Sequence, residues 1–332
     1  MSEAMESFAR TTMADRMREH GSHTGLVEAI REQLSIDYDQ AATQTAAQTF
    51  EARSGNCLSL VILTAAFARH FDIPFEYQNV YKGGAWSRVA GLAFYSGHVN
   101  LRLGPSLSDT WFRRVPGVVL TVDFLEPDTP ARQRVRTVTE ERIIAMYLNN
   151  RAAEAMVDGA LDDAYWLARA ALQADPDFVS AYNTLGVVYR RHGDLAQAER
   201  TLRHAVEREP ANANVLSNLA VVLDAMGRTD DARETRERLL ALAPYPPFHF
   251  LDEGLAATER GDYQAALRLF ERELKRMPYD DELHFAIAVT ELRLGQVRQA
   301  RWHVSLALEN STSRDRRNIY AAKLNYLESL RN

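Results

Sequence analysis

The sequence predicts an α+β domain over residues 1–138, followed by an all-α solenoid of five repeated helix pairs and a capping helix over residues 139–332. Three observations predict this division. Glycine, alanine and proline recur with a fixed period in the second part, a strongly apolar helix opens with the single cysteine, and alternating polar and apolar residues follow that helix. A long fixed period is typical of repeat proteins, and alternation with a period of two is typical of strands.

Composition fits a soluble globular chain of two domains, since 46% of the 332 residues are apolar and 25% are charged. The net charge of -6 disfavours a nucleic-acid partner, and one cysteine excludes an internal disulfide. The longest uncharged apolar run, Cys57–Ala68, is too short for a transmembrane segment, and Met1–His20 has no hydrophobic signal segment. We therefore expect a cytoplasmic protein as the chain stands, or an exported or lipid-anchored one if a signal has been removed.

The first part begins with helices from about Phe8 to Gln48, interrupted by a short break at Ile36–Gln40. The turn residues Ser54 and Gly55 then precede Asn56, which is a good N-cap for a helix running from Cys57 to about His70. This helix is apolar on nearly every side, so we expect it to be buried. The thiol would lie at its positive end, where thiolate character is favoured.

Three strands are expected next, at Phe75–Tyr81, His98–Leu103 and Val118–Leu125. The second and third alternate, with His98 on the polar face of one and Asp123 on the polar face of the other. If these two strands are antiparallel neighbours, the two side chains lie side by side. Cys57, His98 and Asp123 would then be a nucleophile, a base and its orienter. A different register would put Asp109 or Asp128 in the place of Asp123.

These residues resemble a known family. Arg53-x-Gly55-x-Cys57 at the head of an apolar helix, then Gly97-His98-Val99 and Val122-Asp123 on strands, are similar to the motifs of the transglutaminase-like superfamily. The resemblance covers about Asp37 to Asp128. It implies a papain-like fold, with the cysteine on a central helix packed against a sheet that carries the histidine and the aspartate. The two-part layout also resembles bacterial proteins that join such a domain to helical repeats.

The chain departs from that family at two places. The interval between His98 and Asp123 implies an inserted loop around Gly104–Pro116, and no glutamine precedes Cys57 at the papain spacing, since Gln44 and Gln48 lie further upstream. An oxyanion site would then depend mainly on the backbone N–H of Cys57. Asn56 and Trp86 are predicted to contact the substrate, although Trp86 is equally compatible with a surface-loop or core aromatic.

The second part repeats every 34 residues. Its markers are Gly159, Gly193, Gly227, Gly261 and Gly295, then Ala164, Ala198, Ala232, Ala266 and Ala300, and Pro176, Pro210, Pro244 and Pro278. The glycine lets the chain turn after a first helix, the alanine permits close helix contact, and the proline ends the second helix. This spacing resembles the tetratricopeptide repeat. The expected units are 145–178, 179–212, 213–246, 247–280 and 281–313, with a capping helix at about 315–330.

Tetratricopeptide arrays usually bind peptides, so we expect a protein or peptide partner in the concave groove. Asn149, Asn183 and Ser217 occupy equivalent positions on three first helices and would form a ladder that hydrogen-bonds an extended backbone. Arg190 and Arg191 are the one adjacent basic pair on the early first helices. The alternative is that the array only buttresses the first domain.

Two functions follow. The first is a thiol-dependent acyl-transfer enzyme, with a peptidase or amidase favoured over a cross-linking enzyme, in which the repeats deliver a substrate or partner. The second is a non-catalytic interaction scaffold that keeps a transglutaminase-like fold to bind peptides. No histidine lies at a spacing that predicts zinc, and no glycine-rich phosphate loop is present, so we expect no cofactor and no metal.

Overall fold

The structure is a computed structural model of the 332-residue chain. It describes residues 1–39, 43–89, 92–104, 119–122, 135–245, 248–311 and 314–329, with the backbone alone at 37, 81–89, 92–97, 314 and 315. The chain divides into two compact units, Met1–Leu242 and Ala243–Asn332. The first unit therefore contains the α+β part and three helix pairs, and the second begins at the proline-rich segment that follows Leu242.

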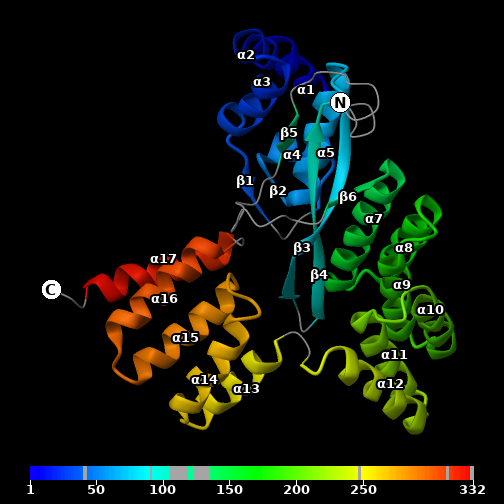
Figure 1. Cartoon of the computed structure of the whole chain (residues 1–332), viewed down its shortest axis with the longest axis vertical. Helices are drawn as coiled ribbons and strands as arrows, with labels where there is room; N and C mark the ends of the chain where they lie inside the picture. Colours follow the sequence, from blue (N-terminus) through cyan, green and yellow to red (C-terminus); the bar gives the residue numbers. More distant parts are fainter. Residues whose placement is uncertain are drawn as a thin grey trace. The chain divides into compact units, whose positions relative to one another are not determined.

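The chain starts with helical segments that pack against the buried helix α5 (Cys57–His70) (Figure 1). Their bounds are α1 (Glu3–Phe8), the π-helical turn η1 (Ala9–Met13), α2 (Ala14–His20), α3 (Ser22–Glu28), the π-helical turn η2 (Ala29–Gln33) and α4 (Ala46–Ala52). Between them, β1 (Asp37–Tyr38) pairs in parallel with β2 (Ser54–Gly55). The predicted break at Ile36–Gln40 is therefore a short strand where the structure describes it.

Helix α5 (Cys57–His70) begins and ends where the sequence predicts. Ten of its fourteen residues are buried, which agrees with an apolar residue on nearly every side. Phe67, together with Phe8 and Phe50, forms a group of tilted and edge-to-face aromatic rings with centroids 5.5–6.1 Å apart. The helix is thus the centre of the first core.

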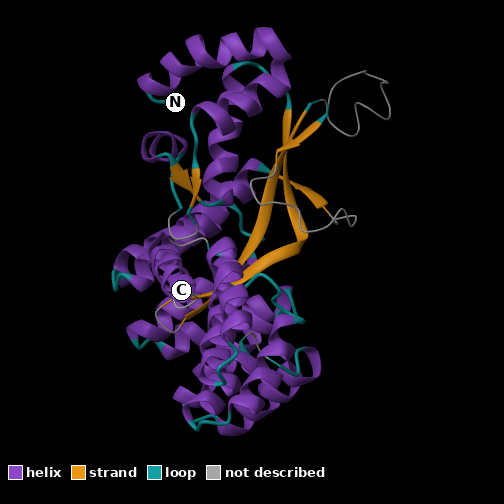
Figure 2. Cartoon of the chain, turned by 90° about the vertical axis from the view of Figure 1, so that its left-hand side faces the viewer, coloured by secondary structure: helices purple, strands orange, loops and turns teal. Residues whose placement is uncertain are grey.

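The sheet has four antiparallel strands in the order β5-β4-β3-β6. Their bounds are β3 (Phe75–Val89), β4 (Leu92–Leu103), β5 (Leu120–Val122) and β6 (Val135–Val138). The strands that carry His98 and lead toward Asp123 are therefore antiparallel neighbours, with Arg102 opposite Thr121. Figure 2 shows β3 and β4 as one long curved ribbon.

The hairpin of β3 and β4 is longer than the sequence predicts. The expected strands were Phe75–Tyr81 and His98–Leu103, whereas pairing continues to Val89 and begins at Leu92, and β6 was not expected. The sequence pattern did not predict the full length of these strands because glycine has a low β-propensity, and the hairpin contains Gly83, Gly84 and Gly91. The register shifts between Val80 and Ala85, which accommodates the first two of these glycines. The predicted inserted loop lies outside the described residues apart from Gly104.

The repeats are helix pairs, as predicted. The first unit holds α7 (Glu140–Val157), α8 (Leu161–Ala174), α9 (Val179–His192), α10 (Leu195–Arg208), α11 (Ala213–Ala225) and α12 (Thr229–Leu242). The second holds α13 (His249–Glu259), α14 (Tyr263–Leu274), α15 (Asp281–Arg293), α16 (Val297–Asn310) and the capping helix α17 (Arg314–Ser329). The predicted boundary after residue 138 lies at the end of β6, immediately before Thr139, the N-cap of α7.

The repeat markers act as expected. All five glycines have positive φ, between 74° and 95°, and all five alanines are fully buried. Gly186 shows why the repeat also needs small residues within the first helix, because a Cβ there would lie 2.6 Å from Leu202 Cγ. Close helix contact therefore depends on paired volumes at these two positions.

A buried carboxylate organises the start of the second unit. Glu273 is fully buried, accepts the backbone N–H of Phe250 at 2.7 Å, and pairs with Arg276 at 2.9 Å. Arg276 also donates to the carbonyl of Tyr245 at 2.8 Å. The buried carboxylate therefore fixes the chain that enters α13 after the proline-rich segment.

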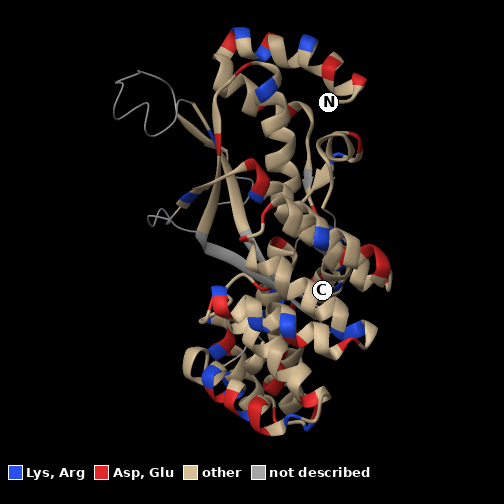
Figure 3. Cartoon of the chain, turned by 90° about the vertical axis from the view of Figure 1, so that its right-hand side faces the viewer, with Lys and Arg blue, Asp and Glu red and all other residues tan. Residues whose placement is uncertain are grey.

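Figure 3 shows acidic and basic residues interspersed along the helices in this view. Among the described residues, no helix has both the length and the apolar character needed to cross a bilayer.

Candidate functional site

Two groups of side chains are candidates for function in the first unit: the start of α5 with the neighbouring sheet, and the first-helix face of the repeats. We define the first-helix face as Asn149, Asn183, Arg190 and Asn218. Both groups are built on regular elements, so their geometry follows from the helices and strands that carry them.

Asn56 caps α5 and places Cys57 in its first turn. The Asn56 Oδ1 atom accepts from the Ser59 backbone N–H at 3.0 Å and from the Ser59 hydroxyl at 2.9 Å. Cys57 is 9% exposed. The helix start and its cap are where the sequence predicts them, and a thiolate at Cys57 stays a prediction.

The cap continues into a network that the sequence analysis did not single out. Asn56 Nδ2 donates to Thr43 Oγ1 at 2.8 Å, and the Thr43 backbone N–H donates to Glu154 Oε1 of α7 at 2.8 Å. Burial raises the pKa of Glu154, while the bonds from Thr43 oppose that shift. The network links the start of α5 to the first repeat helix, and it occupies the Asn56 side chain with internal bonds. The role of Asn56 in substrate binding stays a prediction.

His98 lies on β4, opposite Val80 of β3, and is 5% exposed. Strand alternation puts His98 on the face that carries Val80, Asn100 and Arg102, whereas Val99 belongs to the apolar cluster that contains Cys57. Val80 is buried but is not part of that cluster. Cys57 and His98 are therefore on neighbouring elements, but the pleat of β4 directs His98 away from the face that packs in the Cys57 core.

The His98 face of the sheet is polar and yet buried. Gln78 is 5% exposed, Asn100 2% and Arg102 4%, and the Arg102 guanidinium pairs with Glu76 at 3.0 Å. A buried guanidinium requires such a partner, because an unpaired buried charge is strongly destabilising. Sequence alternation identified this face as polar, but only the structure shows that it is covered.

The remaining predicted residues of this group are not placed by side chain. Trp86 lies on β3 opposite Tyr95. Asp123 and its two alternatives, Asp109 and Asp128, lie outside the described residues. Within the part of the chain that is described, the Cys57 thiol makes no hydrogen bond, and no group of three or more His, Cys, Asp or Glu side chains could hold a metal ion.

On the first-helix face, neighbouring repeats are joined by amides. Asn218 Nδ2 of α11 donates to Asn183 Oδ1 of α9 at 2.9 Å. The sequence predicted Ser217 as the third member of this series. Ser217 is exposed, and the hydrogen bond to Asn183 is made by the next residue, Asn218. Asn149 Oδ1 of α7 is buried and has no hydrogen-bond partner among the described residues.

The two adjacent arginines differ in environment. Arg191 donates from Nη1 to the carbonyl of Met156 at 2.8 Å, so it ties α9 to α7. Arg190 lies seven residues after Asn183, which is the same side of a helix. Its Nε is buried without a partner among the described residues, and burial, followed by repulsion from Arg191, lowers its pKa. Arg190 is thus a guanidinium without a carboxylate on the described chain.

Comparison with known proteins identifies the repeats that carry the first-helix face. Three models described as tetratricopeptide repeat match residues 167–200, 189–249 and 251–313. The C-terminal region consists of tetratricopeptide repeats. The matches lie within residues 167–313, so the transglutaminase-like resemblance of the N-terminal part rests on its motif residues alone.

The similar proteins share this repeat region. Human tetratricopeptide repeat protein 7A is 34% identical over 113 residues, which are 33% of this chain and 13% of that protein. A TPR repeat-containing protein of Pseudomonas aeruginosa is 28% identical over 167 residues, 50% of this chain and 28% of that protein. The chain thus spans less than a third of the length of these curated relatives.

Among solved structures, a thermophilic TPR protein of Thermus thermophilus is similar at 20% identity and a TM-score of 0.33, over 54% of this chain and 98% of that chain. PilF of Pseudomonas aeruginosa is similar at 19% identity and a TM-score of 0.33, over 58% of this chain and 88% of that chain.

Proposed function

We propose that the protein is an interaction scaffold whose tetratricopeptide repeats hold an extended peptide of a partner protein on the first-helix face. Stacked helix pairs provide extended surfaces that suit such ligands. The observation that carries the proposal is the Asn218–Asn183 bond between successive first helices, with unpartnered polar atoms of Asn149 and Arg190 on the same series of helices.

The amide chemistry fits a peptide backbone. The bond between Asn218 and Asn183 uses one N–H and one oxygen, so Asn183 keeps its NH₂ donors and Asn218 keeps its carbonyl acceptor. A peptide unit offers one acceptor and one donor, which these atoms complement.

Arg190 adds a preference for an acidic group. Its buried Nε and the absence of a carboxylate partner among the described residues favour a ligand that supplies one. A partner's Asp, Glu or terminal carboxylate would pair with the guanidinium and offset part of its burial.

The test is a phage-displayed peptide selection against the full chain, followed by binding of the selected peptides to variants. Asn183→Ala and Arg190→Ala should each weaken binding about tenfold or more, as expected for groups at the centre of an interface. Arg200→Ala, an exposed arginine on α10, is the matched control and should bind normally. Selected peptides that bind Asn183→Ala and Arg190→Ala as tightly as the unaltered chain would refute the proposal.

A second candidate function is acyl transfer by the N-terminal part. The capped start of α5 at Cys57 favours it, whereas the pleat of β4 opposes it, because His98 lies on the face of the sheet away from the Cys57 core. In this reaction the Cys57 thiolate attacks an amide carbonyl, and the leaving amine takes a proton from His98. Asp123 would orient the imidazole, and water would then release the acyl group.

Iodoacetamide labelling tests this candidate separately from peptide binding. A nucleophilic thiolate should be alkylated quickly at about pH 6, and His98→Ala should slow labelling about tenfold or more. His70→Ala, an exposed histidine at the other end of α5, should label as the unaltered chain does. A thiol that stays inert until the protein is denatured would exclude the enzyme and leave the scaffold.

A further inference from the structure

Trp302 occupies a repeat position that the array keeps in solvent. The equivalent residues in the other repeats, 34 residues apart, are Trp166, Arg200, Glu234 and Arg268, and none of them is buried. Trp302 itself is 59% exposed. The three internal repeats hold charged side chains here, so the core of a repeat does not require an indole at this position. Exposure alone does not distinguish Trp302 from Trp166, which is 62% exposed, whereas the side chains around Trp302 do.

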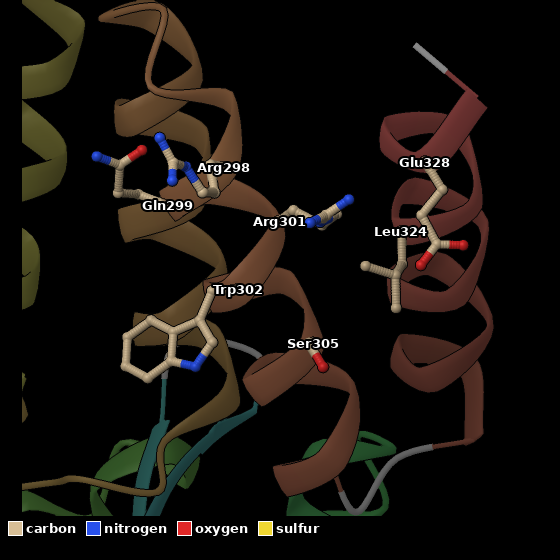
Figure 4. Close-up of a pocket in the computed structure, with 7 residues that line it drawn as sticks. All are labelled: Arg298, Gln299, Arg301, Trp302, Ser305, Leu324 and Glu328. Atoms are coloured by element: carbon tan, nitrogen blue, oxygen red, sulfur yellow. The ribbon is translucent and has the colours of Figure 1, made fainter. Parts of the chain in front are cut away.

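Trp302 lines an open pocket with a volume of about 670 Å³, whose lining residues come from α16 and α17. Its indole lies on the side of α16 away from α17 (Figure 4). The side chains that matter here are Arg298, Arg301, Trp302 and Ser305 of α16, and Leu324 and Glu328 of α17. Figure 4 shows the Arg301 side chain extending from α16 toward Leu324 and Glu328. All of these residues belong to the second unit, so the pocket is defined without reference to the first.

The arginines of this pocket have no ion-pair partner among the described residues. Arg316, at the start of α17, shows the contrast, because it pairs with Asp281 at 3.3 Å and with Glu282 at 2.6 Å. The charged lining residues are two cationic side chains, Arg298 and Arg301, and one anionic side chain, Glu328, so the net charge of the lining is positive. Guanidinium groups bind carboxylates with two parallel hydrogen bonds, and the indole adds apolar contact area.

We propose that this pocket docks an acidic peptide segment of a partner protein. Carboxylates of the segment pair with Arg298 and Arg301, and an apolar side chain of the segment covers the indole of Trp302. The site is distinct from the first-helix face, since it uses residues of other helices, α16 and α17. It gives the scaffold a second attachment point with a preference for negative charge.

A substitution at Glu328 should change the affinity for an acidic peptide in the opposite direction to the arginine substitutions. Because Glu328 is the negative group on the pocket wall, it repels an acidic ligand, and its removal should strengthen binding. A purely apolar docking surface would not respond to this change. The arginine and glutamate variants should therefore shift affinity in opposite directions.

The experiment measures fluorescence anisotropy of a short labelled peptide of alternating Glu and Leu with the full chain. Trp302→Ala and Arg301→Glu should each weaken binding about tenfold, and Glu328→Gln should tighten it about twofold. Trp166→Ala is the matched control, because Trp166 has the same repeat position and is 62% exposed. Its affinity should stay within about twofold of the unaltered chain.

Several results would overturn the proposal. One is that the unaltered chain does not bind the Glu and Leu peptide. Another is that a matching peptide of Lys and Leu binds equally well. A third is that Trp166→Ala loses as much affinity as Trp302→Ala. Comparable affinity for a single-stranded oligonucleotide would replace the acidic peptide with a phosphate ligand. Circular dichroism of each variant separates lost binding from lost folding, and the substitutions are at solvent-accessible positions.

Discussion

Glu291→Gln should change how the stability of the second unit depends on pH. Glu291 of α15 is 7% exposed and its Oε1 lies 3.9 Å from His303 Nε2 of α16. The two rings of His284 and His303 meet with their Nδ1 atoms 3.0 Å apart, and His284 Nε2 lies 3.0 Å from the carbonyl of Pro278. A carbonyl only accepts, so His284 carries its hydrogen on Nε2 and accepts at Nδ1. His303 then donates from Nδ1 and presents a bare Nε2 to Glu291.

The expected change in the free energy of unfolding follows from two opposed pKa shifts, those of Glu291 and His303. Burial raises the pKa of Glu291 from 4.5 to about 7, so its contribution to stability is complete below pH 4.5 and is lost as the pH rises toward 7. Burial, and then His284, lowers the pKa of His303 from 6.5 to about 4, so its contribution is present above pH 6.5 and is lost as the pH falls toward 4. Between about pH 4.5 and 6.5 the two slopes, each about 1.4 kcal/mol per pH unit at most, cancel.

Removing the carboxyl removes the glutamate slope and leaves the contributions of the other groups unchanged. The free energy of unfolding of Glu291→Gln, relative to the unaltered chain, should therefore increase by up to about 2–3 kcal/mol between pH 4.5 and pH 6.5. Urea denaturation followed by circular dichroism and tryptophan fluorescence measures this free energy. Trp302 reports on the site because its ring centroid lies 4.6 Å from that of His303. Glu309→Gln, at a position of α16 that is not buried, is the control. A stability difference that does not change with pH would show that the neutral Glu291–His303 pair does not exist.

Three further substitutions test the packing and hydrogen bonding of the first unit. Gly186→Ala should destabilise the repeats by about 1–3 kcal/mol in thermal denaturation, because its Cβ would overlap Leu202, and adding Leu202→Val should recover part of the loss. Asn56→Ala should lower the unfolding free energy by about 0.5–2 kcal/mol through loss of the α5 cap, whereas an unchanged melting temperature would contradict that role. Glu154→Ala should cost about 1–3 kcal/mol, because the Thr43 N–H loses its acceptor, and hydrogen exchange at Thr43 should then accelerate.

The repeats were predictable because their determinants are local and periodic. Gly193 ends a helix wherever it lies in space, since the requirement for positive φ belongs to the residue itself. The same holds for the start of α5, because an N-cap such as Asn56 bonds a backbone N–H three residues away. Helix bounds in these regions therefore follow from sequence alone.

Pairings between distant residues could not be predicted in this way. Thr43 and Glu154 are 111 residues apart, and no period or motif joins them. His284 and His303 carry no signal individually, and their contact depends on how α15 packs on α16. Whether a polar residue is covered, as for Arg102, also depends on what lies over its face of the sheet.

Sequence by itself determined the two-part architecture, the 34-residue helix pairs and the place of Cys57 at the head of a buried helix, because turns, caps and amphipathic periods act over a few residues. Tertiary structure alone decided the face of β4 on which His98 packs relative to Cys57, the amide contact between Asn183 and Asn218, and the grouping of Trp302 with Arg298 and Arg301. These arrangements depend on long-range packing, in which many weak contacts together fix the position of each helix and strand.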